Sequence, residues 1–485
     1  MAADTQSLHI DQDTFRELGH WLVDKIADYY ASLDARPVSP GLTPAETRTR
    51  LPASAFPEQG LSPDEIIRST VDVLMETSML SGHPRFWGYI IGAGTQIGAL
   101  ADLLAATINP NVGGWHIAPM ASEIEQQTVN WIAEWVNFPP DHGGLLVSGG
   151  AMANYVGFLA ARTNQAEWNI RSEGLRAGGQ LKVYCSVETH TWIQKATDLF
   201  GMGTDAIEWI PTDQHLRMDL QILKARIARD KRDGYVPFLV VATAGSVSTG
   251  AVDDLRGVAE ICRKEGLWFH VDGAYGAPAA HLPECQAVFD GLQEADSIAL
   301  DPHKWFYCPQ EAGCALVRNR QHLLDTFSYR PPYYHFEEYD EEPGINYYEY
   351  GMQNSRGFRA LKVWMTLRQA GKEGLRAMIR HDIAMAQLLY DLVDQAPDFQ
   401  AFKTSLSITT FQYVPDATAS RETINALNEE VMVRLQNGGH AYVTNAVIDD
   451  RYLLRACIVN FRTRHRDIAS LPDAIRAIAA DMANA

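Results

Sequence analysis

The sequence predicts an α/β fold in which a mostly parallel central sheet is flanked by helices on both faces. Between about residues 86 and 365, strand-like and helix-like runs alternate, which is the pattern of successive βαβ units. Several strand candidates are continuous apolar runs, such as 238–242, as expected of strands that are buried on both faces. The strand candidates in chain order are 144–148, 182–187, 207–211, 237–243, 267–272, 297–300 and 313–318.

A helical arm is expected ahead of this sheet. Residues 12–34 place apolar side chains at helical spacing between acids and amides. Residues 35–61 hold five prolines and two glycines, which predicts an extended connector. Ser62 and Glu65 form a capping-box pattern with a proline at the first helical position, so a second helix is expected to begin there. Such an arm is not stable alone and must pack against the main body or another subunit.

A second, smaller α/β unit is expected after the alternating region. A long helix over about 355–371 leads into it, and the apolar runs 407–414 and 451–459 are its strand candidates. The apolar stretch 90–108 is interrupted by polar and small residues, which predicts a buried loop and helix rather than a membrane span. The predicted domains are a helical N-terminal arm (1–88), a large domain (89–365) and a small C-terminal α/β domain (366–485).

Composition and charge argue against several classes of function. The chain is 46% hydrophobic and 21% charged, so a large core is expected and long disorder is not. The net charge of −19 argues against nucleic-acid and membrane partners, because both require a basic face. The six cysteines are scattered without a CxxC pair, so neither a disulfide framework nor a metal site is indicated. No signal-peptide pattern opens the sequence, which predicts a cytoplasmic protein.

A lysine and an aspartate follow two of the predicted strands. Asp272 ends the run 267–272, and Lys304 lies between a histidine and a tryptophan shortly after 297–300. Ligands bind at the carboxyl ends of strands in such sheets, so both side chains are expected at one edge. An amine that condenses with an aldehyde and a carboxylate that holds a ring nitrogen protonated are what pyridoxal phosphate (PLP) chemistry requires. The pair therefore predicts a PLP cofactor, although a single loop lysine is usually a surface residue.

A glycine-rich strand-to-helix turn is the candidate phosphate site. Residues 147–154 contain only one large side chain, Met152, and a helical run follows them. Small residues let the backbone approach a phosphate, and the N–H groups of a helix N-terminus are free to bind one. Gly150 and Ala151 are the predicted phosphate contacts, although an ordinary glycine-rich turn has the same pattern.

Four further residues near predicted strand ends are candidates for cofactor contact. His190 follows the run 182–187, and its imidazole would stack on the pyridine ring and hydrogen-bond the substrate. Thr243 ends its strand, and His303 is placed to donate to the phosphate, although both also fit ordinary packing or turn roles. Asp301 is expected to orient the Lys304 loop or to contact another group of the cofactor, because a carboxylate is unfavourable beside a phosphate.

Together these motifs resemble the group II PLP-dependent decarboxylases, the aromatic-L-amino-acid decarboxylase family. They occur in the family's order, and the resemblance runs from about residue 15 to the C-terminus. The variants at 149–154 and 272–277 look most like bacterial members, including tryptophan-decarboxylase-like enzymes. The residues that carry the resemblance are His83 to Tyr89, Ser148 to Gly150, His190, Thr243 to Gly245, His270 to Tyr275 and Asp301 to Trp305.

The resemblance implies the aspartate-aminotransferase-like type I fold and a homodimer that exchanges its helical arms and shares its active sites. It makes Ala274 a further cofactor contact and Tyr333 a catalytic residue beside Lys304 and His190. An ungapped alignment from Lys304 puts Tyr333 at the loop tyrosine that, in the family's decarboxylases, is thought to protonate the substrate's α-carbon after CO₂ leaves. The family's aldehyde synthases carry phenylalanine there, so Tyr333 favours an amine product, although a tyrosine in a proline-rich loop also fits simple packing.

The expected reaction is decarboxylation of an L-amino acid, with an aromatic substrate favoured. Trp87, Tyr89, Asn111 and Gly113 form the predicted substrate pocket, because the last two leave an open wall that accepts a ring. Departures from the family pattern keep other substrates open: Arg330 replaces an acid or amide, and Asn111 and Gly113 replace bulky groups. The alternatives are a decarboxylase of an acidic or diamino acid, a PLP-dependent aldehyde synthase or aminotransferase, and a non-catalytic PLP-binding scaffold.

Overall fold

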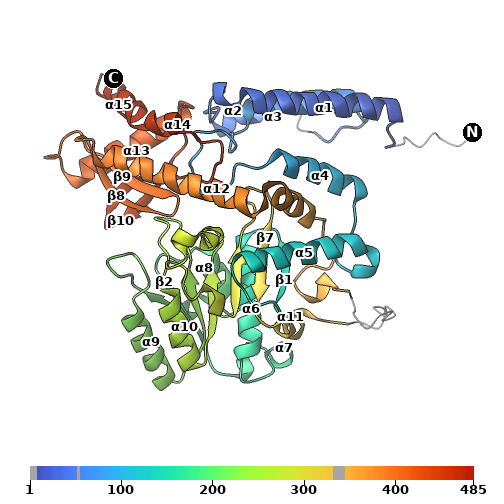
Figure 1. The fold of residues 1–485 in the computed structure, drawn as a ribbon, viewed down its shortest axis with the longest axis vertical. Coiled ribbons are helices and arrows are strands. Elements are labelled where there is room, and N and C mark those ends of the chain that lie inside the picture. Colours follow the sequence, from blue (N-terminus) through green and yellow to red (C-terminus); the bar gives the residue numbers. More distant parts are fainter. Residues whose placement is uncertain (1–7, 52–54, 331–343, 485) are drawn as a thin grey trace, which may run out of the picture.

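The computed structural model describes residues 8–51, 55–330 and 344–484. Figure 1 shows a large body built on one sheet, a smaller body on a second sheet, and an N-terminal arm that runs along one end of the molecule. The predicted domain division into 1–88, 89–365 and 366–485 stays a prediction.

The large body is built on a seven-stranded sheet. The spatial order of its strands is β1-β7-β6-β5-β4-β2-β3. Every neighbouring pair from β3 to β6 is parallel, and β7 runs antiparallel to both β1 and β6. Each strand lies within one residue of its predicted bounds, so the sequence prediction of this sheet is confirmed. The strands are β1 (Gly143–Val147), β2 (Leu181–Ser186), β3 (Ile207–Ile210), β4 (Val236–Thr243), β5 (Trp268–Asp272), β6 (Ser297–Leu300) and β7 (Gly313–Val317).

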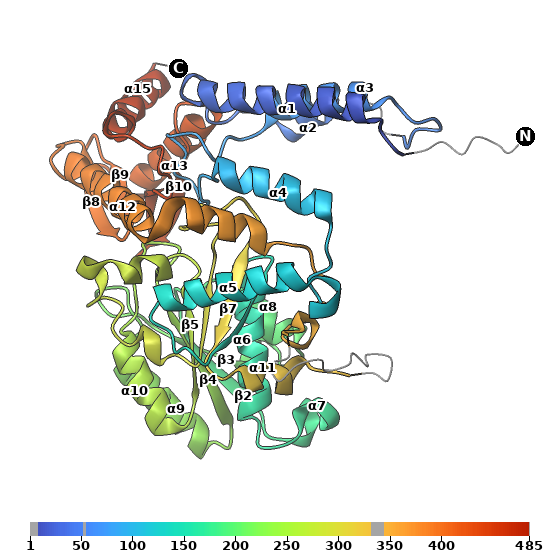
Figure 2. The same cartoon turned by 45° about the vertical axis from the view of Figure 1, so that its right-hand side comes forward.

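Helices cover both faces of this sheet, as Figure 2 shows. Side chains alternate between the faces along a strand, so Val240 and Ala242 of β4 join one hydrophobic core while Leu239 and Val241 join the other. The first core is closed by α5 (Pro119–Trp135), α9 (Leu220–Arg232) and α10 (Leu255–Glu265). The second is closed by α6 (Gly150–Gln165), α7 (Ile170–Glu173), α8 (Trp192–Leu199) and α11 (Arg320–Phe327). This burial on both faces explains the continuous apolar runs.

The smaller body contains a four-stranded antiparallel sheet with the order β10-β11-β9-β8. Strands β9 (Ile408–Tyr413) and β11 (Arg451–Cys457) match the predicted runs, whereas β8 (Phe399–Ser405) and β10 (Thr444–Ile448) were not predicted. These two lie at the edges of the sheet, where one face stays partly open to water and the apolar run is broken. Helices α13 (Arg421–Asn437), α14 (His465–Ala469) and α15 (Leu471–Ala483) accompany the sheet.

One long helix, α12 (Ala360–Asp394), connects the two bodies. Its first part packs on α5 and α4, and its last part packs on β8 and β9. Gly371 interrupts it with φ of 62° and ψ of 173°, a conformation that is accessible only to glycine at low cost. The predicted bridging helix is therefore correct in place, although it is much longer than 355–371.

The N-terminal arm consists of α1 (Gln12–Ser32), α2 (Pro44–Thr49) and α3 (Pro63–Thr77), and α4 (Gln96–Ile108) follows it. The side chain of Ser62 accepts a hydrogen bond from the Glu65 amide at 3.2 Å, so the predicted helix start is confirmed. The prediction of an extended connector at 35–61 is wrong in one part, because a capping box formed by Thr43 and Glu46 starts α2 within it.

Helix α4 corrects the expectation that 90–108 is buried. Leu100, Leu103 and Ile108 on this helix are 51%, 55% and 60% exposed. An apolar helix face that lies open on a single chain is typical of a surface that another chain or segment covers. Among the described residues, every helix is too short or too polar to cross a lipid bilayer.

Candidate active site

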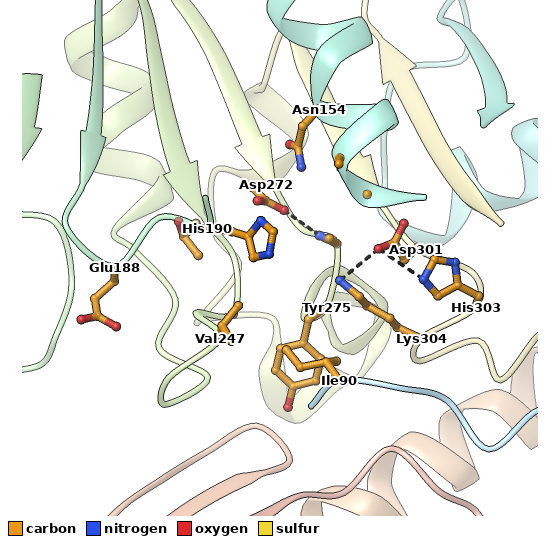
Figure 3. Close-up of a pocket in the computed structure, with 15 residues that line it drawn as sticks. Ile90, Asn154, Glu188, His190, Val247, Asp272, Tyr275, Asp301, His303 and Lys304 are labelled. Atoms are coloured by element: carbon orange, nitrogen blue, oxygen red, sulfur yellow. Dashed lines mark hydrogen bonds and ion pairs between the residues drawn. The ribbon is translucent and has the colours of Figure 1, made fainter. Parts of the chain in front are cut away.

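A cavity of about 210 Å³ lies at the carboxyl ends of β2, β4, β5 and β6, where the polar residues that follow these strands converge. Figure 3 shows the side chains of His190, Asp272, Asp301 and Lys304 directed into one space. The lining residues are Ile90, Gly150, Ala151, Asn154, Glu188, His190, Thr243, Gly245, Val247, Asp272, Ala274, Tyr275, Asp301, His303 and Lys304. All nine residues predicted to contact the cofactor belong to this set.

The amine of Lys304 is held at the floor of the cavity by Asp301. The Nζ atom lies 3.0 Å from Asp301 Oδ2, and the Nε2 atom of His303 lies 3.7 Å from the same oxygen. The second oxygen, Asp301 Oδ1, is buried and has no hydrogen-bond partner among the described residues. Asp301 therefore orients Lys304, in agreement with one of the two roles predicted for it. Its Oδ1 atom remains available to accept a hydrogen bond from a bound group.

Two aromatic residues anchor the loop that carries Lys304. The indole N–H of Trp305 and the hydroxyl of Tyr307 donate to Oδ2 of Asp382, at 3.0 and 2.7 Å. All three side chains are fully buried. Burial raises the pKa of Asp382 to about 8, although the two hydrogen bonds oppose that shift. The loop is thus fixed to α12 on both sides of residue 306, which limits the positions that the Lys304 side chain can take.

Asp272 faces the cavity from the end of β5 and is held by two donors. Its Oδ1 accepts a hydrogen bond from the Ala274 amide at 3.1 Å, and its Oδ2 accepts one from the indole N–H of Trp192 at 2.8 Å. The carboxylate is only 7% exposed, so it acts in a medium of low dielectric constant. A buried anion in this position is suited to pair with a protonated ring nitrogen.

His190 lies between Asp272 and Lys304, and both charges act on it. Burial lowers the pKa of His190 below its usual value, the ammonium of Lys304 lowers it further, and the Asp272 carboxylate opposes these effects. Its Nδ1 accepts a hydrogen bond from the Trp192 amide at 3.3 Å. The imidazole is therefore neutral at neutral pH, and Figure 3 shows it beside Asp272 at the cavity.

The N-terminus of α6 forms one wall of the cavity. Gly149 caps this helix without a side-chain hydrogen bond, so the first amides of the helix are free to bind an anion. A Cβ atom at Gly150 would come within 2.6 Å of Asp301 Oδ2. Glycine is therefore required for the helix to approach the Lys304 loop so closely.

These features fit PLP. The free helix N-terminus suits a phosphate, the Lys304 amine suits an aldehyde, and the Asp272 carboxylate suits a pyridine nitrogen. The unpartnered Asp301 Oδ1 and the side chain of Thr243, which is 6% exposed, add polar groups to the same wall. Each residue predicted to hold the cofactor therefore lines one small cavity.

A chain of hydrogen bonds supports the back of the cavity through His270. Its Nδ1 lies 2.7 Å from Ser297 Oγ, which accepts a hydrogen bond from the Trp268 indole, and its Nε2 lies 2.7 Å from Asn154 Oδ1. Because Asn154 Oδ1 can only accept, His270 carries its proton on Nε2. Burial lowers the pKa of His270 to about 4, so the ring is neutral in the folded protein.

This neutral histidine predicts a pH-dependent contribution to stability. In the unfolded chain His270 binds a proton below its ordinary pKa of 6.5, whereas in the folded protein it stays neutral down to about 4. The stabilisation that the neutral His270 ring gives the folded protein is therefore fully present above about pH 6.5. It is lost progressively as the pH falls from about 6.5 to about 4. Wild type is expected to be more stable than His270→Gln in urea unfolding at about pH 7.5, and the difference is expected to shrink at about pH 5. A difference that is the same at both pH values contradicts the prediction.

Asn111 and Gly113 lie outside this cavity, so the single chain does not bring them to Lys304. They line a separate pocket, whose other lining residues are Gly114, His116, Ile117, Asn346, Tyr348, Asn354 and Ser355. Asn111 Oδ1 accepts hydrogen bonds from the amides of Gly113 and Arg356, each at 3.0 Å. A Cβ atom at Gly113 would lie 2.1 Å from the Asn354 carbonyl oxygen, so the open wall at this position is set by backbone packing.

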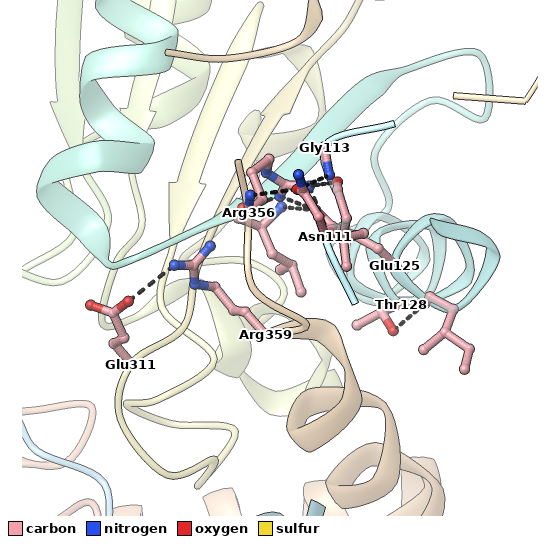
Figure 4. Close-up of polar contacts among 10 residues, drawn as sticks. Asn111, Gly113, Glu125, Thr128, Glu311, Arg356 and Arg359 are labelled. Carbon is pink, nitrogen blue, oxygen red and sulfur yellow. Dashed lines mark hydrogen bonds and ion pairs between the residues drawn. The ribbon is translucent and has the colours of Figure 1, made fainter. Parts of the chain in front are cut away.

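A fully buried ion pair fixes the Asn111 segment to the sheet (Figure 4). Arg356 pairs with Glu125 of α5, and the side chains are 1% and 0% exposed. Arg356 also donates to the carbonyl oxygens of Val112 at 2.9 Å and Leu146 at 2.6 Å, and the Leu146 amide donates to Glu125 at 2.9 Å. Because every group in this cluster is paired, the two charges are tolerated in the core.

The prediction that Trp87 lines the substrate pocket is wrong for the described chain. Its side chain is 0% exposed, and its indole N–H donates to Thr463 Oγ1 at 3.1 Å within the core of the smaller body. Tyr89 is 51% exposed and its ring lies 6.0 Å from the ring of Tyr442, outside the cavity lining. Tyr333 lies outside the described residues, so its predicted role has no structural account.

Several lining residues were not predicted. The missed residues are Ile90, Asn154, Glu188, Gly245, Val247 and Tyr275. Most of them are neighbours of predicted motifs, so adjacency to a strand end was the available signal. Ile90 had no such signal, because the segment before α4 reaches the cavity only through tertiary packing.

Comparisons with known proteins agree with this geometry. The pyridoxal-dependent decarboxylase conserved domain matches residues 44–414. An aromatic-L-amino-acid decarboxylase from Bacillus atrophaeus is 34% identical, over 99% of this chain and 98% of its own length. The crystal structure of Oryza sativa TDC with PLP and tryptamine has a TM-score of 0.92 at 28% identity, covering 98% of this chain and 100% of that one. A 4-hydroxyphenylacetaldehyde synthase from Rhodiola rosea has a TM-score of 0.87 at 26% identity, covering 97% and 99%.

Proposed function

Because the chain belongs to the pyridoxal-dependent decarboxylase family, we propose that it converts an aromatic L-amino acid into the corresponding amine and CO₂. The cofactor is PLP. The observation that carries the proposal is the single cavity that joins Lys304, Asp272 and the N-terminus of α6. The similarity to an aromatic-L-amino-acid decarboxylase and to a structure that contains tryptamine supports an aromatic substrate.

The roles of the residues follow from what the cofactor needs. When bound, PLP supplies an aldehyde that condenses with amines and a ring that accepts the electron pair left when CO₂ departs. Lys304 would hold the cofactor through its amine, which lies 3.0 Å from Asp301 Oδ2 and is oriented by it. Asp272 keeps the ring nitrogen protonated.

The remaining groups orient the cofactor and the substrate. The amides at Gly150 and Ala151 and the side chain of His303 would hold the phosphate, and His190 would contact the ring. Because its Nδ1 accepts from the Trp192 amide, the neutral imidazole carries its proton on Nε2 and would donate a hydrogen bond to the substrate. Side chains that orient the substrate relative to the bound cofactor would therefore control the rate of CO₂ loss.

Apolar groups at the mouth of the cavity favour an aromatic side chain over a charged one. Ile90 and Val247 both line it, and Val247 is 41% exposed on the single chain. Burying apolar surface against a substrate ring is favourable by about 25 cal/mol per Å². An acidic or diamino substrate would bring a second charge to these side chains and would be disfavoured.

A CO₂-release screen tests the substrate class. The proteinogenic amino acids, dopa, ornithine and diaminobutyrate are incubated with the PLP-loaded protein, and CO₂ and amine are measured together. The proposal expects release from tryptophan, tyrosine, phenylalanine or dopa. Release from only acidic or diamino acids contradicts the aromatic assignment, and a coloured protein that releases no CO₂ supports a scaffold.

The active unit is proposed to be a homodimer with shared sites. The exposed apolar face of α4 adjoins an arm that itself exposes Phe15 (62%) and Leu74 (56%), and such extended apolar surface needs a covering partner. In this arrangement, the Asn111 and Gly113 wall completes the cavity of the partner subunit. Sedimentation is expected to give twice the mass of one chain, and Leu103→Glu is expected to shift the population to monomers with lower activity. A wild-type monomer with full activity contradicts the dimer.

An aldehyde synthase is the second candidate, favoured by the similarity to the Rhodiola rosea enzyme. The two reactions differ in whether a proton or oxygen reaches the substrate's α-carbon after CO₂ leaves. By the family resemblance, Tyr333 supplies the proton, and wild type is therefore expected to release amine. Tyr333→Phe is expected to shift product from amine towards aldehyde, with oxygen uptake and peroxide formation. An unchanged amine yield in this variant removes Tyr333 from the mechanism.

A further inference from the structure

Trp192 makes a buried contact with Asp272 that the proposed chemistry does not yet use. Its indole N–H donates to Asp272 Oδ2 at 2.8 Å. The side chain of Trp192 is 1% exposed, at the start of α8 and two residues after His190. The same residue thus supports both groups that face the cofactor, because its backbone amide donates to His190 Nδ1.

We propose that Trp192 is a positioning residue for the reaction, which holds Asp272 in the orientation that keeps the cofactor's ring nitrogen protonated. This inference rests on the proposed role of Asp272. Each oxygen of the carboxylate accepts one hydrogen bond from the protein, Oδ1 from the Ala274 amide and Oδ2 from the indole. The two bonds fix the plane of the carboxylate, and each oxygen keeps a lone pair for the ring.

The neighbouring His270 cannot replace this donor. His270, whose ring lies 5.8 Å from that of Trp192, has both nitrogens occupied by Ser297 and Asn154. Loss of the indole N–H therefore leaves Asp272 Oδ2 short of a protein donor inside the core. The carboxylate is then free to rotate away from the ring nitrogen, and its charge is less well stabilised.

The same tryptophan also packs in a hydrophobic core, so a test must separate the two contributions. Its ring contacts that of Phe158 edge-on, with centroids 6.4 Å apart. Trp192→Phe keeps an aromatic ring in this space and removes the N–H donor together with part of the indole's packing volume. Trp135→Phe is the matched control: Trp135 is 3% exposed, and its indole N–H donates to a backbone carbonyl, that of Pro278, at 2.7 Å, away from the cavity.

The experiment measures PLP-loaded wild type, Trp192→Phe and Trp135→Phe by three readouts. These are the pH midpoint of the visible absorption of the bound cofactor, kcat and KM with the substrate found in the CO₂ screen, and the thermal unfolding temperature without cofactor. If Asp272 is less well oriented in Trp192→Phe, the ring nitrogen of the cofactor carries less positive charge. Less positive charge on the ring makes the bound cofactor easier to protonate at its other basic nitrogen. The pH midpoint of the visible absorption is therefore expected to rise by about half a pH unit. Its kcat is expected to fall about tenfold, with KM changed less than about twofold.

Trp135→Phe is expected to keep the wild-type midpoint and kcat, although it loses thermal stability as Trp192→Phe does. The inference is overturned if Trp192→Phe has the wild-type midpoint and kcat, or if both variants change kcat equally. An Asp272→Ala variant separates the proposed role of Asp272 from the proposed role of Trp192. If Asp272→Ala leaves the midpoint unchanged, the proposed role of Asp272 itself fails; if it moves the midpoint and Trp192→Phe does not, only the role of Trp192 fails.

Discussion

Replacing Lys304 by alanine is expected to abolish both CO₂ release and the visible absorption of the bound cofactor. Lys304 is the lysine whose amine lines the cavity, and it lies 3.0 Å from the Asp301 carboxylate that orients it. Without it, the cofactor has no covalent tether and the substrate has no protein amine to displace. Absorption spectra of the purified protein and CO₂ measurements on each tested amino acid check the prediction.

Two controls show whether the loss is chemical rather than structural. Lys195→Ala removes an exposed lysine from α8, and wild-type colour and activity are expected. Added methylamine is expected to restore part of the colour in Lys304→Ala, because a free amine can take the place of the lost Nζ. A Lys304→Ala protein that still releases CO₂ at the wild-type rate would exclude PLP chemistry at this cavity.

Replacing Asp272 by alanine is expected to lower kcat by about 10²- to 10³-fold while the cofactor stays bound through Lys304. The carboxylate is 7% exposed and faces the cavity, so its charge is weakly screened and acts strongly on a bound ring. Without that charge, the ring nitrogen loses its proton, and the ring accepts electrons from the substrate less readily.

Single-turnover rates and cofactor content measured on the same preparation check this prediction. Asp272→Asn keeps the size of the side chain and one of its two acceptor oxygens. This variant is expected to lose nearly as much activity as Asp272→Ala, because the negative charge rather than the shape is required. Asp233→Asn, on the surface after α9, serves as a control with wild-type activity. A kcat within about twofold of wild type in Asp272→Ala would contradict the proposed role.

The central sheet and the residues that line the cavity at its edge could be predicted because their signals are local. Strands buried on both faces give continuous apolar runs, as in β4, and a residue that directly follows such a run lies at the carboxyl edge of a parallel sheet. Asp272 and Lys304 are 32 positions apart, but each is tied to its own strand end, so adjacent strands bring them together. The edge strands β8 and β10 were missed because partial exposure breaks the apolar pattern.

The substrate wall was harder to predict, because it depends on contacts between distant segments. Trp87 lies in the same motif as Tyr89, yet its indole packs into the core of the smaller body and donates to Thr463. Asn111 and Gly113 are held away from the cavity by Arg356, far along the chain. Trp192 gave no signal in the sequence, since a tryptophan in a helical run is usually core, and only its contact with Asp272 distinguishes it.

The sequence by itself determined the α/β architecture and the PLP cofactor, and it predicted the amine and the carboxylate proposed to act on that cofactor. It could do so because strand periodicity and strand-end residues are encoded within a few positions of one another. Only the tertiary structure decided which side chains support those two groups and which of the predicted residues do not line the cavity. That information lies in hydrogen bonds such as that of Trp192 to Asp272, 80 positions apart, and in buried pairs such as Glu125 with Arg356, 231 positions apart. Contacts of this kind form when separate segments pack together, and no local pattern in the chain records them.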